Sequence, residues 1–105
     1  MWQSKNRDVG VRLGAEEEDG REYISVSADY MPDGTIRPVG IRFADGPAYA
    51  VARVISVTHM SATKKNGAET RYNVRIGDRE HYLFFEDAQL RRAPRWYVAK
   101  RQAPF

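Results

Sequence analysis

Residues 70–86, TRYNVRIGDREHYLFFE, contain the clearest structural signal in this 105-residue chain. Apolar and polar residues alternate over 71–76, which is typical of a strand with one buried face. Gly77-Asp78 then fits a two-residue hairpin turn, because these residue types tolerate the backbone angles that such turns require. The apolar run 82–85 has hydrophobic residues on both faces and predicts a central strand. These residues therefore predict an antiparallel hairpin.

Further strands are expected on both sides of this hairpin. Alternation over 23–30 and 38–43 predicts two strands, separated by the turn residues Pro32-Asp33-Gly34. The run 49–57 changes phase, and a β-bulge near Arg53 would reconcile its two halves. A last strand is expected over 95–100, after a connection in which 87–92 can form one helical turn.

Six short strands joined by tight turns predict an all-β fold. We expect an antiparallel meander of about six strands that curls into a small, partly open β-barrel, with a strongly bent open sheet as the alternative. The predicted core consists of Ile24, Val26, Val39, Ile41, Phe43, Tyr49, Val51, Ile55, Val74, Ile76, Leu83, Phe85, Trp96 and Val98.

Composition narrows the classes of protein. There is no cysteine, which excludes disulfides, zinc–thiolate sites and cysteine nucleophiles. Residues 1–20 contain no apolar run like a signal peptide, and no segment reaches the roughly 20 apolar residues of a membrane span. We therefore expect a cytoplasmic protein. Residues 1–22 are predicted to be an acidic N-terminal tail, either disordered or an edge strand, and 23–105 to form a single β domain.

The charge is unevenly distributed along the chain. Residues 1–22 hold four basic and six acidic residues, and the remainder holds thirteen and eight, so net charges of −2 and +5 give the overall +3. Clustered positive charge favours anionic partners, although a surplus of this size also occurs on ordinary soluble surfaces.

The sequence offers little for catalysis or metal binding. His59 and His81 are the only histidines, and no third ligand stands at a suitable spacing. Glu86 and Asp87 are adjacent in a strand, so their side chains should point to opposite faces and could not form one acid–base pair. We expect no catalytic residues, no metal and no cofactor, and hence a protein that is not an enzyme.

Basic and aromatic residues instead suggest a non-catalytic binding module that contacts a protein partner or nucleic acid through a basic face. Small β-barrels bind single-stranded nucleic acid by stacking bases on exposed rings while cations contact the backbone. The candidate phosphate contacts are Arg71, Arg75, Arg91, Arg92, Arg95 and Lys100, and Tyr97 is the candidate stacking ring. Tyr82 and Phe84 should face away from His81. The alternative is a homodimeric protein-interaction domain that uses an open sheet edge or the apolar run 82–85 and has no nucleic-acid role.

Several segments resemble an uncharacterised family of short bacterial all-β proteins. They are the motifs PDGxIxP (32–38), DGxxYxVxRV (45–54), RYxVRIGxRExYLFFE (71–86) and RWYV (95–98). The resemblance covers about residues 23–101, and Phe43 stands where that family commonly has tryptophan. No activity or catalytic residue is established for the family. Some similar proteins are encoded near translesion DNA polymerases, which implies a role linked to nucleic acid or repair.

Overall fold

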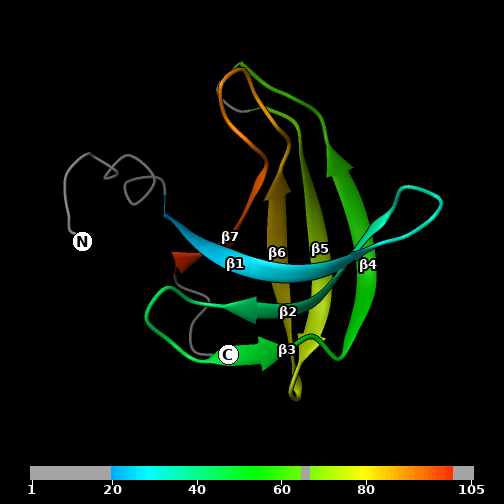
Figure 1. The fold of residues 1–105 in the computed structure, drawn as a ribbon, viewed down its shortest axis with the longest axis vertical. Coiled ribbons are helices and arrows are strands. Elements are labelled where there is room, and N and C mark those ends of the chain that lie inside the picture. The colour runs from blue at the N-terminus through cyan, green and yellow to red at the C-terminus, as the bar shows by residue number, and fades with distance from the viewer. Residues whose placement is uncertain (1–19, 65–66, 101–105) are drawn as a thin grey trace.

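The computed structural model describes residues 20–64 and 67–100, which form one antiparallel sheet (Figure 1). Its strands are β1 (Arg21–Tyr30), β2 (Ile36–Arg42), β3 (Ala48–Ala50), β4 (Arg53–Met60), β5 (Glu69–Ile76), β6 (Arg79–Glu86) and β7 (Arg95–Ala99). The sheet curls into an open half-barrel, with β1 and β2 crossing in front of β4, β5 and β6 in Figure 1. The predicted all-β class and partly open barrel are confirmed.

The strand order is β3-β2-β1-β7-β6-β5-β4. Each neighbouring pair is consecutive in the chain except β1 and β7, which join two meanders into one sheet. The two edges are therefore β3 and β4, although they are adjacent in sequence. We call the line along which the two ends of the curled sheet approach each other, with β2 and β3 on one side and β4 on the other, the seam. At one end of the seam, the Val51 amide donates to the Val39 carbonyl at 2.9 Å and the Ala52 amide to the Arg75 carbonyl at 2.8 Å. Backbone hydrogen bonds thus close the seam near the connection from β3 to β4.

The hydrophobic core lies on the inner face of the curled sheet. Its buried residues are Ile41, Tyr72, Val74, Ile76, Leu83, Trp96 and Val98. The Trp96 ring lies 4.8 Å from that of Phe85 and 5.3 Å from that of Tyr72, measured between centroids. Six of the predicted core residues are in this cluster, and Ile24, Val26, Phe43, Tyr49, Val51 and Phe85 pack against it partly buried. The core prediction is therefore largely confirmed.

A β-bulge in β2 makes the core prediction for Val39 wrong, and Ile55, the other predicted core residue outside the cluster, lies at a bulge in β4. Ser27 pairs with Gly40 and Ala28 with Pro38, so Val39 is the extra residue. Val39 is 38% exposed, whereas Pro38 is buried. Strict alternation fails here because a bulge shifts the inward and outward positions by one residue.

The run predicted as one strand over 49–57 is two strands, β3 and β4, which gives seven strands instead of about six. They separate because β3 pairs with β2 and β4 pairs with β5. The bulge expected near Arg53 lies at Ile55, the extra residue between Val54 and Ser56. Its phase change allows Val54 to face the core.

The single helical turn expected over 87–92 is absent. Gln89 and Arg92 instead exchange two backbone hydrogen bonds, of 3.0 and 2.9 Å, around a tight turn. Arg91 in that turn has a φ of 67°.

At the N-terminal end of the described residues, Arg21 and Glu22 belong to β1, so the strand begins earlier than the predicted boundary at residue 23. The rest of the predicted tail, 1–19, lies outside the described residues. The described part of the chain includes no helix with the length and hydropathy needed to cross a membrane.

Candidate functional site

The outer face of the sheet, opposite the core, collects the basic and aromatic residues of β5 and β6. Directly paired residues of antiparallel strands project from the same face. The facing pairs are Arg71 with Phe84, Asn73 with Tyr82, and Arg75 with Glu80. As predicted, Tyr82 and Phe84 point away from His81, which is buried on the inner face. The hairpin therefore presents arginines and aromatic rings side by side.

We call Arg71, Asn73, Arg75 and Tyr82 the arginine–tyrosine patch. The guanidinium carbon of Arg71 lies 4.7 Å from the centroid of the Tyr82 ring. Tyr82 is 43% exposed. Arg75 Nη2 lies 3.8 Å from Glu80 Oε2, and Asn73 Nδ2 donates to Glu80 Oε1 at 3.4 Å. The patch thus combines an accessible ring with two cations and an amide, and Glu80 is an exposed carboxylate beside it.

Strand β4 extends this patch with further hydrogen-bond donors. Arg53 faces Arg75, Ser56 faces Asn73 and Thr58 faces Arg71 in the β4–β5 register. Arg53, Ser56 and Thr58 are all exposed. The outer face over β4, β5 and β6 therefore carries three arginines, two hydroxyl groups and an amide around Tyr82.

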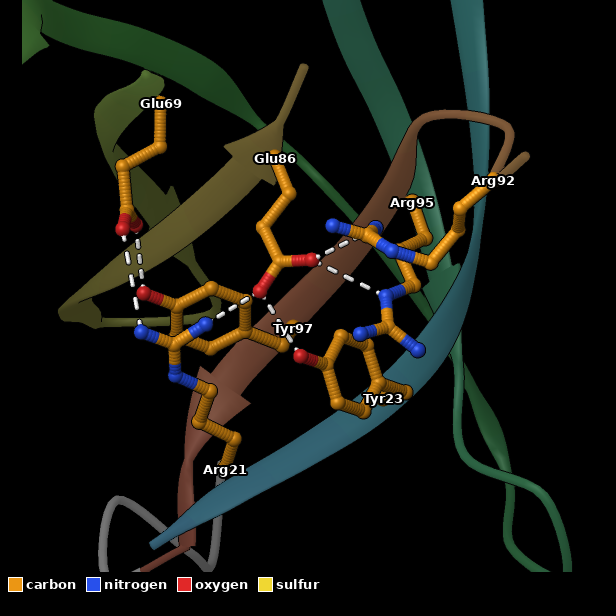
Figure 2. Close-up of polar contacts among 7 residues, drawn as sticks. All are labelled: Arg21, Tyr23, Glu69, Glu86, Arg92, Arg95 and Tyr97. Carbon is orange, nitrogen blue, oxygen red and sulfur yellow. Dashed lines mark hydrogen bonds and ion pairs between the residues drawn. The ribbon is translucent and has the colours of Figure 1, made fainter. Parts of the chain in front are cut away.

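A second group on the same face is built around two buried carboxylates (Figure 2). Glu69 of β5 pairs directly with Glu86 of β6, and the two residues are 7% and 5% exposed. Like charges placed opposite each other destabilise a sheet, so this arrangement requires compensating cations. We call Glu69 and Glu86, with Arg21, Tyr23, Arg92, Arg95 and Tyr97, the carboxylate cluster.

Glu86 is the centre of the carboxylate cluster. One of its oxygens accepts hydrogen bonds from Arg92 Nη1 and Arg95 Nε, both at 2.9 Å. The other accepts from the Tyr23 hydroxyl at 2.7 Å and from Arg21. The Arg95 guanidinium also lies 3.9 Å from the centroid of the Tyr23 ring. Figure 2 shows these donors converging on one carboxylate.

Arg21 links the two carboxylates. Its Nη1 binds Glu86, and its Nη2 lies 3.8 Å from Glu69 Oε2. The Tyr97 hydroxyl donates to Glu69 Oε1. The carboxylate cluster therefore holds three arginines against two glutamates, and it connects β1, β5, β6 and β7.

The environment of the carboxylate cluster lowers the pKa of Glu86 and raises the pKa values of Tyr97 and Tyr23. Burial alone would raise the pKa of Glu86, but hydrogen bonds from Tyr23 and Arg95 and the charges of Arg95 and Arg21 lower it below its usual value. Burial and the hydrogen bond to Glu69 raise the pKa of Tyr97 well above its usual value. Burial likewise raises the pKa of Tyr23, with the Glu86 hydrogen bond adding to the shift. A carboxylate held ionised by four donors is poorly suited to proton transfer near neutral pH.

The structure divides the predicted site residues into three sets. Arg71 and Arg75 lie together in the arginine–tyrosine patch, whereas Arg92 and Arg95 bind Glu86. Arg91 and Lys100 are exposed beyond opposite ends of β7. The seven predicted residues are therefore not brought into one group of contacts.

Tyr97 does not fit the predicted base-stacking role. It is only 6% exposed, and its ring stacks on Phe84 with centroids 4.8 Å apart. The guanidinium carbon of Arg21 lies 4.5 Å from the Tyr97 centroid. Alternation placed Tyr97 on the outer face, but the residues that cover it come from strands distant in sequence. Tyr82 is the accessible ring beside an arginine.

Four residues of these two groups were not predicted as site residues from the sequence, namely Arg21, Tyr23, Glu69 and Tyr82. A signal for part of the site was present, because a two-residue turn at Gly77-Asp78 fixes the register of the whole hairpin. That register places Glu69 against Glu86 and Tyr82 against Asn73. Nothing local in the sequence predicts that Arg21 and Tyr23 reach the same carboxylates.

Among residues 20–64 and 67–100, no group of three His, Asp or Glu side chains is placed to hold a metal ion. His59 Nδ1 lies 3.1 Å from Thr70 Oγ1, on the opposite side of the sheet from the arginine–tyrosine patch.

Comparisons with protein families, with curated proteins and with solved structures found no match for this chain.

Proposed function

We propose that this protein is a non-catalytic binding module that holds single-stranded nucleic acid on the outer face of β4, β5 and β6. The observation that carries the proposal is the exposed Tyr82 ring beneath the guanidinium of Arg71. A base can stack on an accessible tyrosine, and an adjacent arginine can contact the phosphate beside that base. Both groups project from neighbouring strands, which fix their separation.

The surroundings of Tyr82 support this role. Arg53 and Arg75 extend the positive charge along the face, and Ser56, Thr58 and Asn73 supply hydrogen-bond donors of the kind that contact phosphate and sugar. Glu80 is the one exposed carboxylate among these facing residues of β4, β5 and β6. A single strand is favoured over a duplex, because only unstacked bases offer a free face to a protein ring.

The experiment is fluorescence anisotropy with a labelled oligothymidylate of about twelve nucleotides, a length within the roughly 4–16 nucleotides that small barrels cover. Tyr82→Ala should weaken binding about 5- to 150-fold, the range expected for losing one stacked base at roughly 1–3 kcal/mol. Tyr30→Ala is the matched control, since Tyr30 is also an exposed tyrosine but lies at the end of β1. It should leave the affinity unchanged.

The salt dependence separates this function from its rival. Phosphate contacts predict a log–log slope of roughly −0.7 per neutralised phosphate of a single strand. A homodimeric protein-interaction domain predicts no oligonucleotide binding and a concentration-dependent dimer in sedimentation. Absence of binding at micromolar protein in low salt, or equal weakening by Tyr82→Ala and Tyr30→Ala, would contradict the proposed function.

A further inference from the structure

The open end of the seam between β2 and β4 forms a cavity of about 550 Å³. Ligand sites are typically roughly 300–1,000 Å³, largely apolar, with a few polar groups at defined positions. The apolar lining here consists of Ile36, Val57, Tyr72 and Phe85, contributed by four strands. We call this cavity the mouth of the half-barrel. Val57 is 46% exposed, so an apolar surface is accessible inside the mouth.

The charged residues lining the mouth have one sign. Among the residues that the structure describes, Asp33 and Asp87 are the only formally charged ones that line the mouth, and none of the described lysines and arginines lines it. Asp33 is held by the Thr35 hydroxyl at 2.7 Å and the Thr35 amide at 3.0 Å. The Thr35 hydrogen bonds lower the pKa of Asp33, which keeps it ionised. The mouth is thus acidic, whereas the outer face over the same strands is basic.

One wall of the mouth is a sheet edge. Within the described residues, β4 pairs on one side only, with β5. The other side of β4, including the stretch from Ser56 to Met60, pairs with no neighbouring strand. Val57 and His59 alternate toward the mouth, and Ser56 and Thr58 face the opposite side. An exposed edge of this kind pairs readily with an added extended strand.

We infer that this mouth binds an extended peptide of a protein partner, which adds to the edge of β4 and places an apolar side chain in the cavity with basic side chains at Asp33 and Asp87. Alternate residues of an added strand would point inward, so the partner should carry basic and apolar residues at every second position. Charge complementarity selects this occupant, since an acidic peptide or a phosphate group would meet two carboxylates. This site lies on the opposite face from the arginine–tyrosine patch and is independent of the proposed function.

Nuclear magnetic resonance titration of the full chain with two capped peptides, acetyl-KTVTVTK-amide and acetyl-ETVTVTE-amide, tests the inference. The lysine peptide should shift the amide resonances of 56–60 and 33–36, and it should bind at least about tenfold more tightly than the glutamate peptide. Asp33→Asn combined with Asp87→Asn should remove most of that preference. Asp45→Asn, a change at an exposed turn aspartate outside the mouth, should retain it.

Val57→Lys supplies a second test, because it puts a cation inside the cavity without altering the outer face. It should abolish binding of the lysine peptide, while a thermal melt and the dispersion of the amide resonances verify that the variant is folded. Equal affinity for both peptides, or shifts confined to the outer face, would overturn the inference. Concentration-dependent shifts of β4 without peptide would also overturn it, since they would show that a second copy of the chain occupies the edge.

Discussion

The arginine–tyrosine patch and the carboxylate cluster lie on the same face of the same strands, yet they differ in what their arginines contact. Around Glu86, three arginines converge on a carboxylate that is 5% exposed. Around Tyr82, Arg71 lies over an accessible ring, and Arg75 has a single exposed carboxylate at 3.8 Å. Residue type alone therefore does not tell whether an arginine contacts a buried carboxylate or an accessible ring. That difference depends on which side chains the neighbouring strands place within reach of the arginine.

The largest effect is expected at the centre of the carboxylate cluster. Glu86→Gln removes the negative charge that Arg21, Arg92 and Arg95 share, and breaking a buried ion pair typically costs about 3–5 kcal/mol. The arginine side chains are 17% to 34% exposed, so water offsets part of the loss and we expect a decrease of roughly 2–4 kcal/mol. Urea denaturation measures this change in the free energy of unfolding.

Glu80→Gln is the matched control on the same strand and face. The Glu80 side chain is 52% exposed, and its ion pair should contribute less than about 1 kcal/mol. Acid titration sharpens the contrast. Because the pKa of Glu86 is lower in the folded chain, its contribution is present above the unfolded value of roughly 4.3 and is lost as the pH falls through the folded value. The difference between wild type and Glu86→Gln should therefore shrink below about pH 4. A constant difference across that range would contradict this account of Glu86.

A smaller effect is expected at Tyr97. Tyr97→Phe keeps the stacked ring but removes the hydrogen bond to the buried Glu69, at a cost of roughly 1–2 kcal/mol. The pKa of Tyr97 is raised in the folded chain, so its contribution is complete below the unfolded value of about 10 and is lost as the pH rises toward the folded value. The variant should thus lose less stability than wild type between about pH 10 and 12, as followed by circular dichroism.

Tyr30→Phe, at an exposed position, is the control for Tyr97→Phe and should alter neither stability nor alkaline unfolding. The pKa of Tyr23 is also raised, and this residue remains in both variants, so the alkaline loss should be reduced without disappearing. Identical alkaline behaviour of Tyr97→Phe and wild type would show that the Glu69 contact contributes nothing to the carboxylate cluster.

Local patterns in the sequence were sufficient for the fold class and most of the core. Alternation and turn chemistry are short-range, and they predicted β1, β2, β5, β6, β7 and the hairpin at Gly77-Asp78. The errors at Val39 and in the run 49–57 occur where a bulge or a change of partner strand interrupts the alternation. The phase change within 49–57 did indicate a bulge near Arg53. The change of partner strand between β3 and β4 depends on which strands meet, and no local window of the sequence contains that information.

The sites were harder to predict because they combine distant strands. The pairing of β1 with β7 brings Arg21 and Tyr23 to Glu69 and Glu86, across up to 65 residues of chain. The pairing of β6 with β7 brings Arg95 to Glu86 and Phe84 to Tyr97, and β1 adds Arg21 over the Tyr97 ring. The sequence prediction treated Arg95 and Tyr97 as available to a ligand because it did not include these cross-strand contacts. Arg71 and Arg75 were placed correctly on a shared face because their positions depend on one strand and one turn.

The distinction between the two groups of arginines can be tested directly by comparing Arg71→Ala with Arg95→Ala. Arg71→Ala should weaken oligonucleotide binding several-fold and reduce the salt slope by about 0.7, the effect of losing one phosphate contact, with little change in stability. Arg95→Ala should lower the free energy of unfolding, because Glu86 loses a donor at 2.9 Å, but it should leave the salt slope of the folded protein unchanged. Both measurements use the same protein preparations, so each variant serves as the control for the other. A reduced salt slope in Arg95→Ala would mean that the carboxylate cluster also contacts phosphate. It would contradict the proposed division between arginines that bind Glu86 and arginines of the patch that bind nucleic acid.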